Sequence, residues 1–111
     1  MIIYLILRYI LDVRAISEKA LRNFAKRYPD SDAALRAWCK LVKSGTFRNL
    51  AELKQTFGSV DYVPTKKGDF YVFDIAGNRH RLIAAIHFNT QMLFIRYVLT
   101  HAEYDRGGWK K

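Results

Sequence analysis

The chain has 111 residues, half of them hydrophobic, which predicts one folded domain with a modest core and argues against disorder. Its 19 lysines and arginines exceed its 10 aspartates and glutamates, so the formal net charge is +9 at pH 7. This excess favours a polyanionic partner (RNA, DNA or an acidic protein) over a basic surface that serves only solubility. Cys39 is the single cysteine. That excludes an internal disulfide and a cysteine zinc site, and it fits a reducing cytoplasm.

The first twelve residues, MIIYLILRYILD, are mostly apolar. A membrane span needs roughly 20 apolar residues, so this run is too short to cross a bilayer. It also lacks the basic leader and the cleavage site of a signal peptide. We therefore treat residues 1–12 as an N-terminal extension and expect residues 13–111 to form a single domain that does not engage a membrane.

Three amphipathic helices are expected in the first half of the chain. Ser17 can cap a helix that ends at Pro29, and a second helix follows and stops at Gly45. Asn49 and Glu52 have the spacing of a capping pair, which predicts a short third helix after Asn49. The apolar stripes of these helices are expected to lie in the core.

After residue 60 the hydrophobic period changes from 3.6 to 2, which is typical of strands. A short strand is expected before Pro64, which should end it. Three longer strands should form an antiparallel meander, over residues 70–76, 79–88 and 92–100. The tail after Thr100 begins as a helical turn and is expected to fray at Gly107 and Gly108. Helices followed by an antiparallel sheet predict an α+β domain.

The two turns of the meander predict the register of its strands. A two-residue turn at Gly77 and Asn78 places Asp74 opposite Arg81, and a three-residue loop over 89–91 places Ile83 opposite Tyr97 and Phe88 opposite Met92. Because side chains alternate faces, one face then carries polar residues, namely Asp74, Arg79, Arg81, His87, Tyr97 and His101. The other face should meet the helices and contains Tyr71, Phe73, Ile75, Leu82, Ala84, Ile86, Phe88, Phe94 and Val98.

Several polar side chains keep two interpretations. Arg96 falls on the apolar face in this register, so either it reaches out at an edge or a bulge shifts the pairing. Arg81 can form a cross-strand ion pair with Asp74 or bind phosphate. His101 can cap the tail or transfer protons, and Tyr104 can cover the sheet edge or take part in chemistry.

The segments YVFDIAGNRHRLIAAIHF and IRYVLTHAEYD together resemble the HigB-type toxins of the RelE-like mRNA interferase superfamily. The likeness covers nearly the whole chain from about Arg14 and includes RYPDS and TFRNLAELKQTF. It implies the RelE-like microbial ribonuclease toxin fold and cleavage of mRNA without a metal or other cofactor, usually on the translating ribosome. It also implies a cognate helix-turn-helix antitoxin, through which the toxin–antitoxin complex binds its operator DNA.

The resemblance also points to the site. Arg81 corresponds to the arginine on the central strand of the superfamily, and His101 and Tyr104 correspond to polar residues near the C-terminus. These three are the candidate catalytic residues. Metal-free RNA cleavage needs a base for the 2′-hydroxyl, an acid for the 5′-oxygen and a cation for the non-bridging oxygens, and it leaves a 2′,3′-cyclic phosphate and a 5′-hydroxyl. The candidate RNA-binding residues are Lys66, Lys67, Asn78 and Arg79.

Two other functions fit the same charge. One is a nucleic-acid-binding module without catalysis, and the other is a toxin of the same superfamily that poisons DNA gyrase. His101 and Tyr104 beside Arg81 favour the nuclease. Related chains begin with Met where this chain has Val13, so residues 1–12 are either an artefact of an upstream start site or a real extra helix packed on the sheet.

Overall fold

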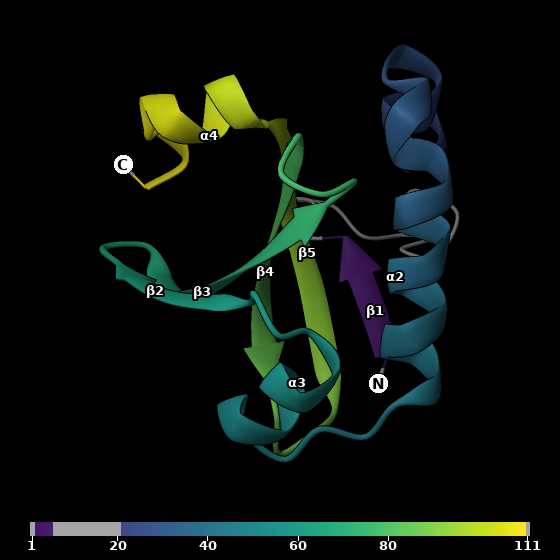
Figure 1. Ribbon diagram of the computed structural model, residues 1–111. Coiled ribbons are helices and arrows are strands. Elements are labelled where there is room, and N and C mark those ends of the chain that lie inside the picture. The colour runs from purple at the N-terminus through teal and green to yellow at the C-terminus, as the bar shows by residue number, and fades with distance from the viewer. Residues whose placement is uncertain (1, 6–20, 111) are drawn as a thin grey trace.

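The computed structural model describes residues 2–5 and 21–110 (Figure 1). The elements are β1 (Ile2–Leu5), a helical segment over 21–27, the 3-10 turn η1 (Pro29–Ser31), α2 (Asp32–Ser44), α3 (Leu50–Thr56), β2 (Asp61–Thr65), β3 (Gly68–Ile75), β4 (His80–His87), β5 (Met92–Thr100), α4 (His101–Arg106) and the 3-10 turn η2 (Gly108–Lys110). The strands form one sheet in the order β1-β5-β4-β3-β2. The predicted α+β class is confirmed.

The helices begin and end near the predicted residues. The first described helix gives way to the η1 turn that starts at Pro29, and α2 ends at Ser44, with Gly45 as its C-cap. Asn49 caps α3, because its side-chain oxygen accepts a hydrogen bond of 2.9 Å from the backbone N–H of Glu52. The expected cap at Ser17 lies outside the described residues. Among the described residues, no helix is long and apolar enough to cross a bilayer.

The predicted meander is confirmed as β3, β4 and β5. Asp74 pairs with Arg81, as the turn at Gly77 and Asn78 predicts, and Ile83 pairs with Tyr97. The expected three-residue loop over 89–91 is wrong, because His87 pairs with Met92 and the loop has four residues, 88–91. β2 adds a fourth antiparallel strand beside β3. The expectation that Pro64 ends this strand is wrong. Pro64 lies within β2, at the edge of the sheet, where its missing N–H leaves no ladder bond unmade.

A β-bulge shifts the pairing of β4 with β5. Directly after the pair of Ile83 and Tyr97, Ala84 pairs with Ile95, so Arg96 is the extra residue on β5. Of the two expectations for Arg96, the bulge is therefore confirmed.

The bulge corrects two expectations beyond this point. Met92 pairs with His87 rather than with Phe88. Phe94 was expected on the helical face, but the shift turns it to the opposite face, where its ring meets His87 with centroids 5.3 Å apart. The physical reason is that side chains on a strand alternate faces with a period of two. One extra residue at the bulge therefore exchanges the faces of the β5 side chains between the bulge and the loop 88–91.

β1 pairs in parallel with β5 at the other edge of the sheet. Residues 2–5 of the N-terminal extension therefore form a strand rather than a helix. Residues 6–12 of the extension lie outside the described residues.

The sheet has an apolar cluster on each face. On one face, Trp38 of α2 packs against Phe73 of β3 with ring centroids 5.4 Å apart, in the larger cluster. The opposite face holds a smaller cluster around Phe70 and Ile83, which Trp109 covers. In Figure 1, α2 and α4 accordingly lie on opposite sides of the sheet.

The tail does not fray after α4. Gly107 adopts a left-handed conformation with φ of 74°, which turns the chain back onto the sheet as η2. Trp109 is then only 4% exposed, and its indole N–H donates to the carbonyl of Tyr104 at 3.1 Å. The expectation of fraying at Gly107 and Gly108 is wrong, because burial of this large ring holds residues 107–110 in place.

Candidate active site

Arg81 lies at the start of β4, and its side chain is only 10% exposed. Its Nε is 3.2 Å from Oδ1 of Asp74, so the predicted ion pair is present. Its Nη1 donates to the carbonyl of His80 at 3.1 Å, and its Nη2 donates to Oδ1 of Asn78. A buried charge is costly unless it is paired, and these three partners fix the guanidinium in one orientation. Asn78, expected to bind RNA, is placed where it holds Arg81.

Tyr104 projects from α4 onto this arginine. The Cζ atom of Arg81 lies 5.3 Å from the centre of the Tyr104 ring, a cation–π contact. The other neighbour of Tyr104 is Trp109, stacked at 5.2 Å with 16° between the ring planes. Burial, together with the charge of Asp61, raises the pKa of Tyr104 above the ordinary phenol value. The phenol is therefore neutral and retains a proton that it can donate.

His101 is the first residue of α4, and its side chain is 43% exposed. Its backbone N–H donates to the carbonyl of Arg79 at 2.9 Å, which places it at the same end of the sheet as Arg81. Its Nδ1 lies 3.1 Å from a carboxylate oxygen of Asp105. The helix is fixed here by a capping box, in which Thr100 and Glu103 bond each other's backbone. The structure thus provides a partly exposed imidazole on α4, three residues before Tyr104, at the end of the sheet where β4 begins.

His80 was not among the predicted site residues. Its side chain is buried between the rings of Phe24 and Tyr28, each with its centroid 5.3 Å away. Its Nε2 is 3.1 Å from Oδ2 of Asp30, and Arg79 donates to the same oxygen at 3.3 Å. Burial acts to raise the pKa of Asp30, but its hydrogen bonds with His80 and Arg79 hold it below the ordinary value. Arg79, expected to bind RNA, is exposed beside this contact.

The signal for this contact was present in the sequence but not decisive. The run Arg79-His80-Arg81 shows that three basic residues follow a turn, yet nothing local indicates which of them is buried. Asp30 lies 50 positions away and meets His80 only when η1 packs on the sheet.

Lys66 and Lys67 lie in the turn between β2 and β3, and both are exposed. Nζ of Lys67 reaches the hydroxyl of Tyr97 on β5 at 3.4 Å. The turn therefore bends over the polar face of the sheet, the same face that carries Arg81. The described residues contain no group of three or more His, Cys, Asp or Glu side chains that could hold a metal ion.

Comparison with known proteins adds a family to this geometry. Residues 31–107 match the model of a family described as HigB_toxin, the RelE-like toxic component of a toxin–antitoxin system. The matched range contains Arg81, His101 and Tyr104 and ends before Trp109. The chain belongs to the HigB toxin family.

Two similar proteins are named mRNA interferases. The chain is 37% identical over 90 residues to the mRNA interferase toxin HigB of Escherichia coli (strain K12), covering 81% of this chain and 86% of the relative. It is 31% identical over 91 residues to the mRNA interferase HigB of Escherichia coli O6:H1 (strain CFT073), covering 82% and 87% of the two chains.

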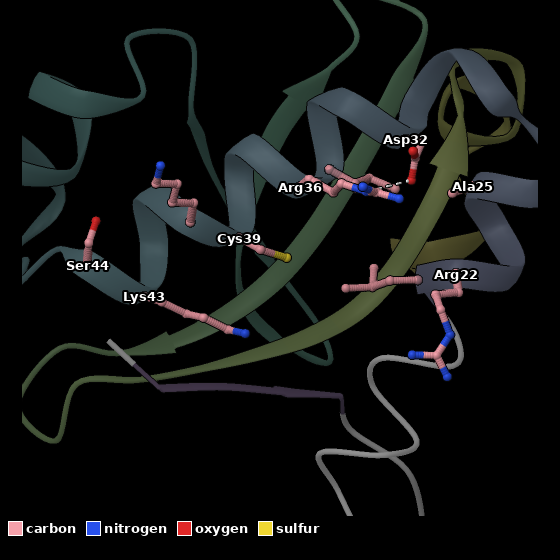
Figure 2. A pocket seen from close by; sticks show the side chains of 10 residues that line it. Arg22, Ala25, Asp32, Arg36, Cys39, Lys43 and Ser44 are labelled. Carbon is pink, nitrogen blue, oxygen red and sulfur yellow. Dashed lines mark hydrogen bonds and ion pairs between the residues drawn. The ribbon is translucent and has the colours of Figure 1, made fainter.

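A groove of about 650 Å³ lies in the helical layer (Figure 2). This layer covers the face of the sheet opposite to that of Arg81 and Tyr104. It runs between the helical segment 21–27 and α2, and Cys39 points into it. Burial raises the pKa of the Cys39 thiol above its ordinary value, so the reactive thiolate is disfavoured. The basic side chains on its rim include Arg36 and Lys43, but the groove supplies no acid–base pair for RNA cleavage. We therefore place the candidate active site of this HigB-family chain on the opposite face.

Proposed function

We propose that this chain is the toxin of a toxin–antitoxin pair and an endoribonuclease that cleaves mRNA without a metal ion. Membership of the HigB family and the relatives named mRNA interferases support this function. The observation that assigns this function to particular residues is the contact of buried Arg81 with Tyr104, together with the partly exposed imidazole of His101 on the same helix as Tyr104.

The guanidinium of Arg81 supplies the cation. An arginine has five N–H groups. His80 and Asn78 each accept a hydrogen bond from one Nη, and Asp74 is ion-paired with Nε at 3.2 Å, which leaves one further N–H on each Nη. These two, one on each Nη, are free to meet the non-bridging oxygens of a phosphate. Negative charge grows on those oxygens in the transition state, and a cation that is already oriented stabilises it without reorganisation.

His101 and Tyr104 supply the proton transfers. The 2′-hydroxyl loses its proton and attacks phosphorus, and the departing 5′-oxygen takes up a proton. The products are a 2′,3′-cyclic phosphate and a 5′-hydroxyl. An imidazole titrates near neutrality and suits either transfer. The neutral phenol of Tyr104, held over Arg81, suits donation at the phosphate.

The partners follow from the family and the charge. We propose that the enzyme acts on mRNA in the cytoplasm on the translating ribosome, whose RNA attracts a chain of net charge +9. A cognate helix-turn-helix antitoxin neutralises it through an acidic segment and binds operator DNA in the complex. The family description supports an antitoxin partner.

The chemistry of the RNA ends tests the proposal. The purified toxin is added to ribosomes translating a defined mRNA, with and without EDTA, and new ends are mapped by labelling 5′-hydroxyls. We expect 5′-hydroxyl ends at in-frame positions, undiminished by EDTA and absent with Arg81→Ala. A chain that binds RNA but leaves no new ends would be a non-catalytic module, and arrest of DNA gyrase without RNA cleavage would identify a gyrase poison.

A further inference from the structure

A second groove, of about 540 Å³, lies between the turn joining β2 to β3 and the ends of β4 and β5 nearest the loop 88–91. The charged and aromatic side chains that line it are Lys67, Asp69, Phe70, His87, Phe94 and Arg96. His87 and Arg81 are both on β4 and an even number of residues apart, so they share a face of the sheet. At about 3.3 Å per residue, the far end of the groove at His87 lies roughly 20 Å along the strand from Arg81.

The β-bulge delivers Arg96 to this groove. In the register expected from the sequence, which has no bulge, Arg96 points toward the helices and their apolar cluster. In the structure its Cζ lies 5.3 Å from the centre of the Phe70 ring, on the same face as Arg81. A bulge typically redirects a side chain at a functional position. This bulge interrupts the ladder and puts a cation and an aromatic ring, Arg96 and Phe94, on the polar face.

The groove presents the two groups that single-stranded RNA needs. Phe94 and His87 meet edge to face at 84°, so their rings form a corner against which a base can pack. Arg96 and Lys67 supply cations for a phosphate. Asp69 reduces the net charge, which suits a nucleotide with one phosphate better than a polyphosphate. The volume is within the ordinary range for small-molecule sites.

Lys67 and Tyr97 connect the groove with the active site. Tyr97 is opposite Ile83, between Arg81 and His87 along the sheet, and the Lys67 ammonium reaches its hydroxyl at 3.4 Å. Trp109 covers Phe70 and Ile83 on the β3 side. An RNA strand that runs along this face from the groove to Arg81 must therefore lie over β5, the side that Trp109 leaves uncovered.

We propose that this groove is a second nucleotide-binding subsite, which holds the RNA substrate several nucleotides from the scissile phosphate. Phe94 and His87 pack against a base, and Arg96 and Lys67 bind its phosphate. The proposal rests on the proposed nuclease function and adds the path of the RNA over the sheet. It assigns a binding role to residues 87, 94 and 96, which the chemistry at Arg81 does not use.

Binding of RNAs of two lengths tests the subsite. Single-stranded RNAs of about 4 and about 16 nucleotides, the range covered by small single-strand-binding domains, are titrated against the full chain by fluorescence anisotropy. The Arg81→Ala background prevents cleavage. Phe94→Leu removes the ring but keeps apolar bulk, and Arg96→Gln removes the charge. Lys54→Gln, an exposed position on α3, is the matched control for loss of charge.

We expect Phe94→Leu to weaken binding of the long RNA by about 5- to 100-fold, the usual effect of losing one base stack. Arg96→Gln should weaken it and reduce the slope of affinity against salt, while Arg96→Lys should restore the slope. The short RNA should bind all variants alike, and Lys54→Gln should match the parent. Equal affinity of the parent and both groove variants for the long RNA would overturn the subsite, as would equal losses for both RNAs.

Melting temperatures and cleavage separate this proposal from the others. A variant that binds the long RNA weakly only because it unfolds would lose the short RNA as well, and its melting temperature would fall. Phe94→Leu is also made in the chain that keeps Arg81. If this variant cleaves ribosome-bound mRNA at the parental rate and its RNA affinity is unchanged, the proposed subsite is wrong, but the proposed nuclease function stands. If the groove variants bind RNA more weakly but even the parent chain never cleaves RNA, the binding groove is supported and the proposed nuclease function is wrong.

Discussion

Arg81 of β4 lies under the ring of Tyr104 of α4, with its Cζ 5.3 Å from the ring centre. The contact joins the sheet to the C-terminal helix. Asp74 and Asn78 hold the guanidinium from the strand side, and Trp109 holds the phenol from the tail side. Both groups are therefore fixed before RNA binds, so they can stabilise a transition state without a further cost in reorganisation of the site.

Replacing Arg81 with alanine should abolish toxicity and reduce cleavage by about 10²–10³-fold, because a cation aimed at the transition state is lost. The protein should still fold. Single-turnover cleavage and a thermal melt of the same sample measure both quantities. Asp74→Asn is the control, since it removes the ion pair but leaves the bonds of Arg81 to His80 and Asn78. If Asp74→Asn and Arg81→Ala lose the same activity and the same melting temperature, Arg81 is only a structural partner.

His101→Ala and Tyr104→Phe should each slow cleavage, by up to about 10²–10⁴-fold, while leaving RNA affinity close to that of the parent. Both changes act on protons rather than on binding. Arg79→Gln and Lys66→Gln should do the reverse, with weaker binding and a shallower salt dependence. Measured kcat and Kd for the four variants separate the two groups. A drop in RNA affinity with unchanged kcat for His101→Ala would remove it from the chemistry.

Asp30 should make folding stability depend on pH in the acid range. The hydrogen bonds with His80 and Arg79 lower its pKa in the folded chain below the ordinary 3.8. At a pH between the folded pKa and the unfolded pKa, the unfolded chain therefore binds more protons than the folded chain. Stability from Asp30 is then fully present above pH 3.8 and is lost as the pH falls through the lower, folded pKa. Asp30→Asn should reduce the melting temperature at pH 7, and the difference should shrink toward pH 3. A difference that stays constant over that range would contradict this assignment.

Association with the antitoxin should slow sharply as salt is added. The net charge of +9 attracts an acidic contact segment, and the distance over which charges act falls from about 30 Å at 0.01 M salt to about 3 Å at 1 M. Stopped-flow association rates at several salt concentrations measure this steering. Expression without antitoxin should arrest growth, and co-expression should relieve the arrest. An association rate independent of salt would count against an acidic contact.

A chain that begins with Met in place of Val13 should fold and be as toxic as the full chain. The deletion removes β1 and uncovers an edge of β5. It leaves β3, β4 and β5 and the apolar cluster between them and α2. Solubility, thermal melts and growth arrest compare the two chains. Loss of soluble folding would show that β1 is needed and that the first twelve residues belong to the domain.

The sequence by itself determined the elements whose causes are local. A change of hydrophobic period after residue 60 indicated the strands, and Asn49 with Glu52 indicated a helix start, because a cap needs only neighbouring residues. The turn at 76–79 determined that Asp74 faces Arg81, since a short turn leaves little freedom of register. The candidate catalytic residues came from the same pattern together with the family resemblance.

Tertiary structure alone decided the features that depend on distant segments. The bulge at Arg96 was one of two alternatives in the sequence, and the packing of β5 between the two apolar clusters settled it and turned Phe94 to the polar face. Trp109 anchors the tail because a buried surface on β3 and β4 receives its ring. Asp30 meets His80 across 50 positions of chain. Local patterns report the preferences of neighbouring residues, whereas these contacts depend on which surfaces remain uncovered once the sheet and helices have packed.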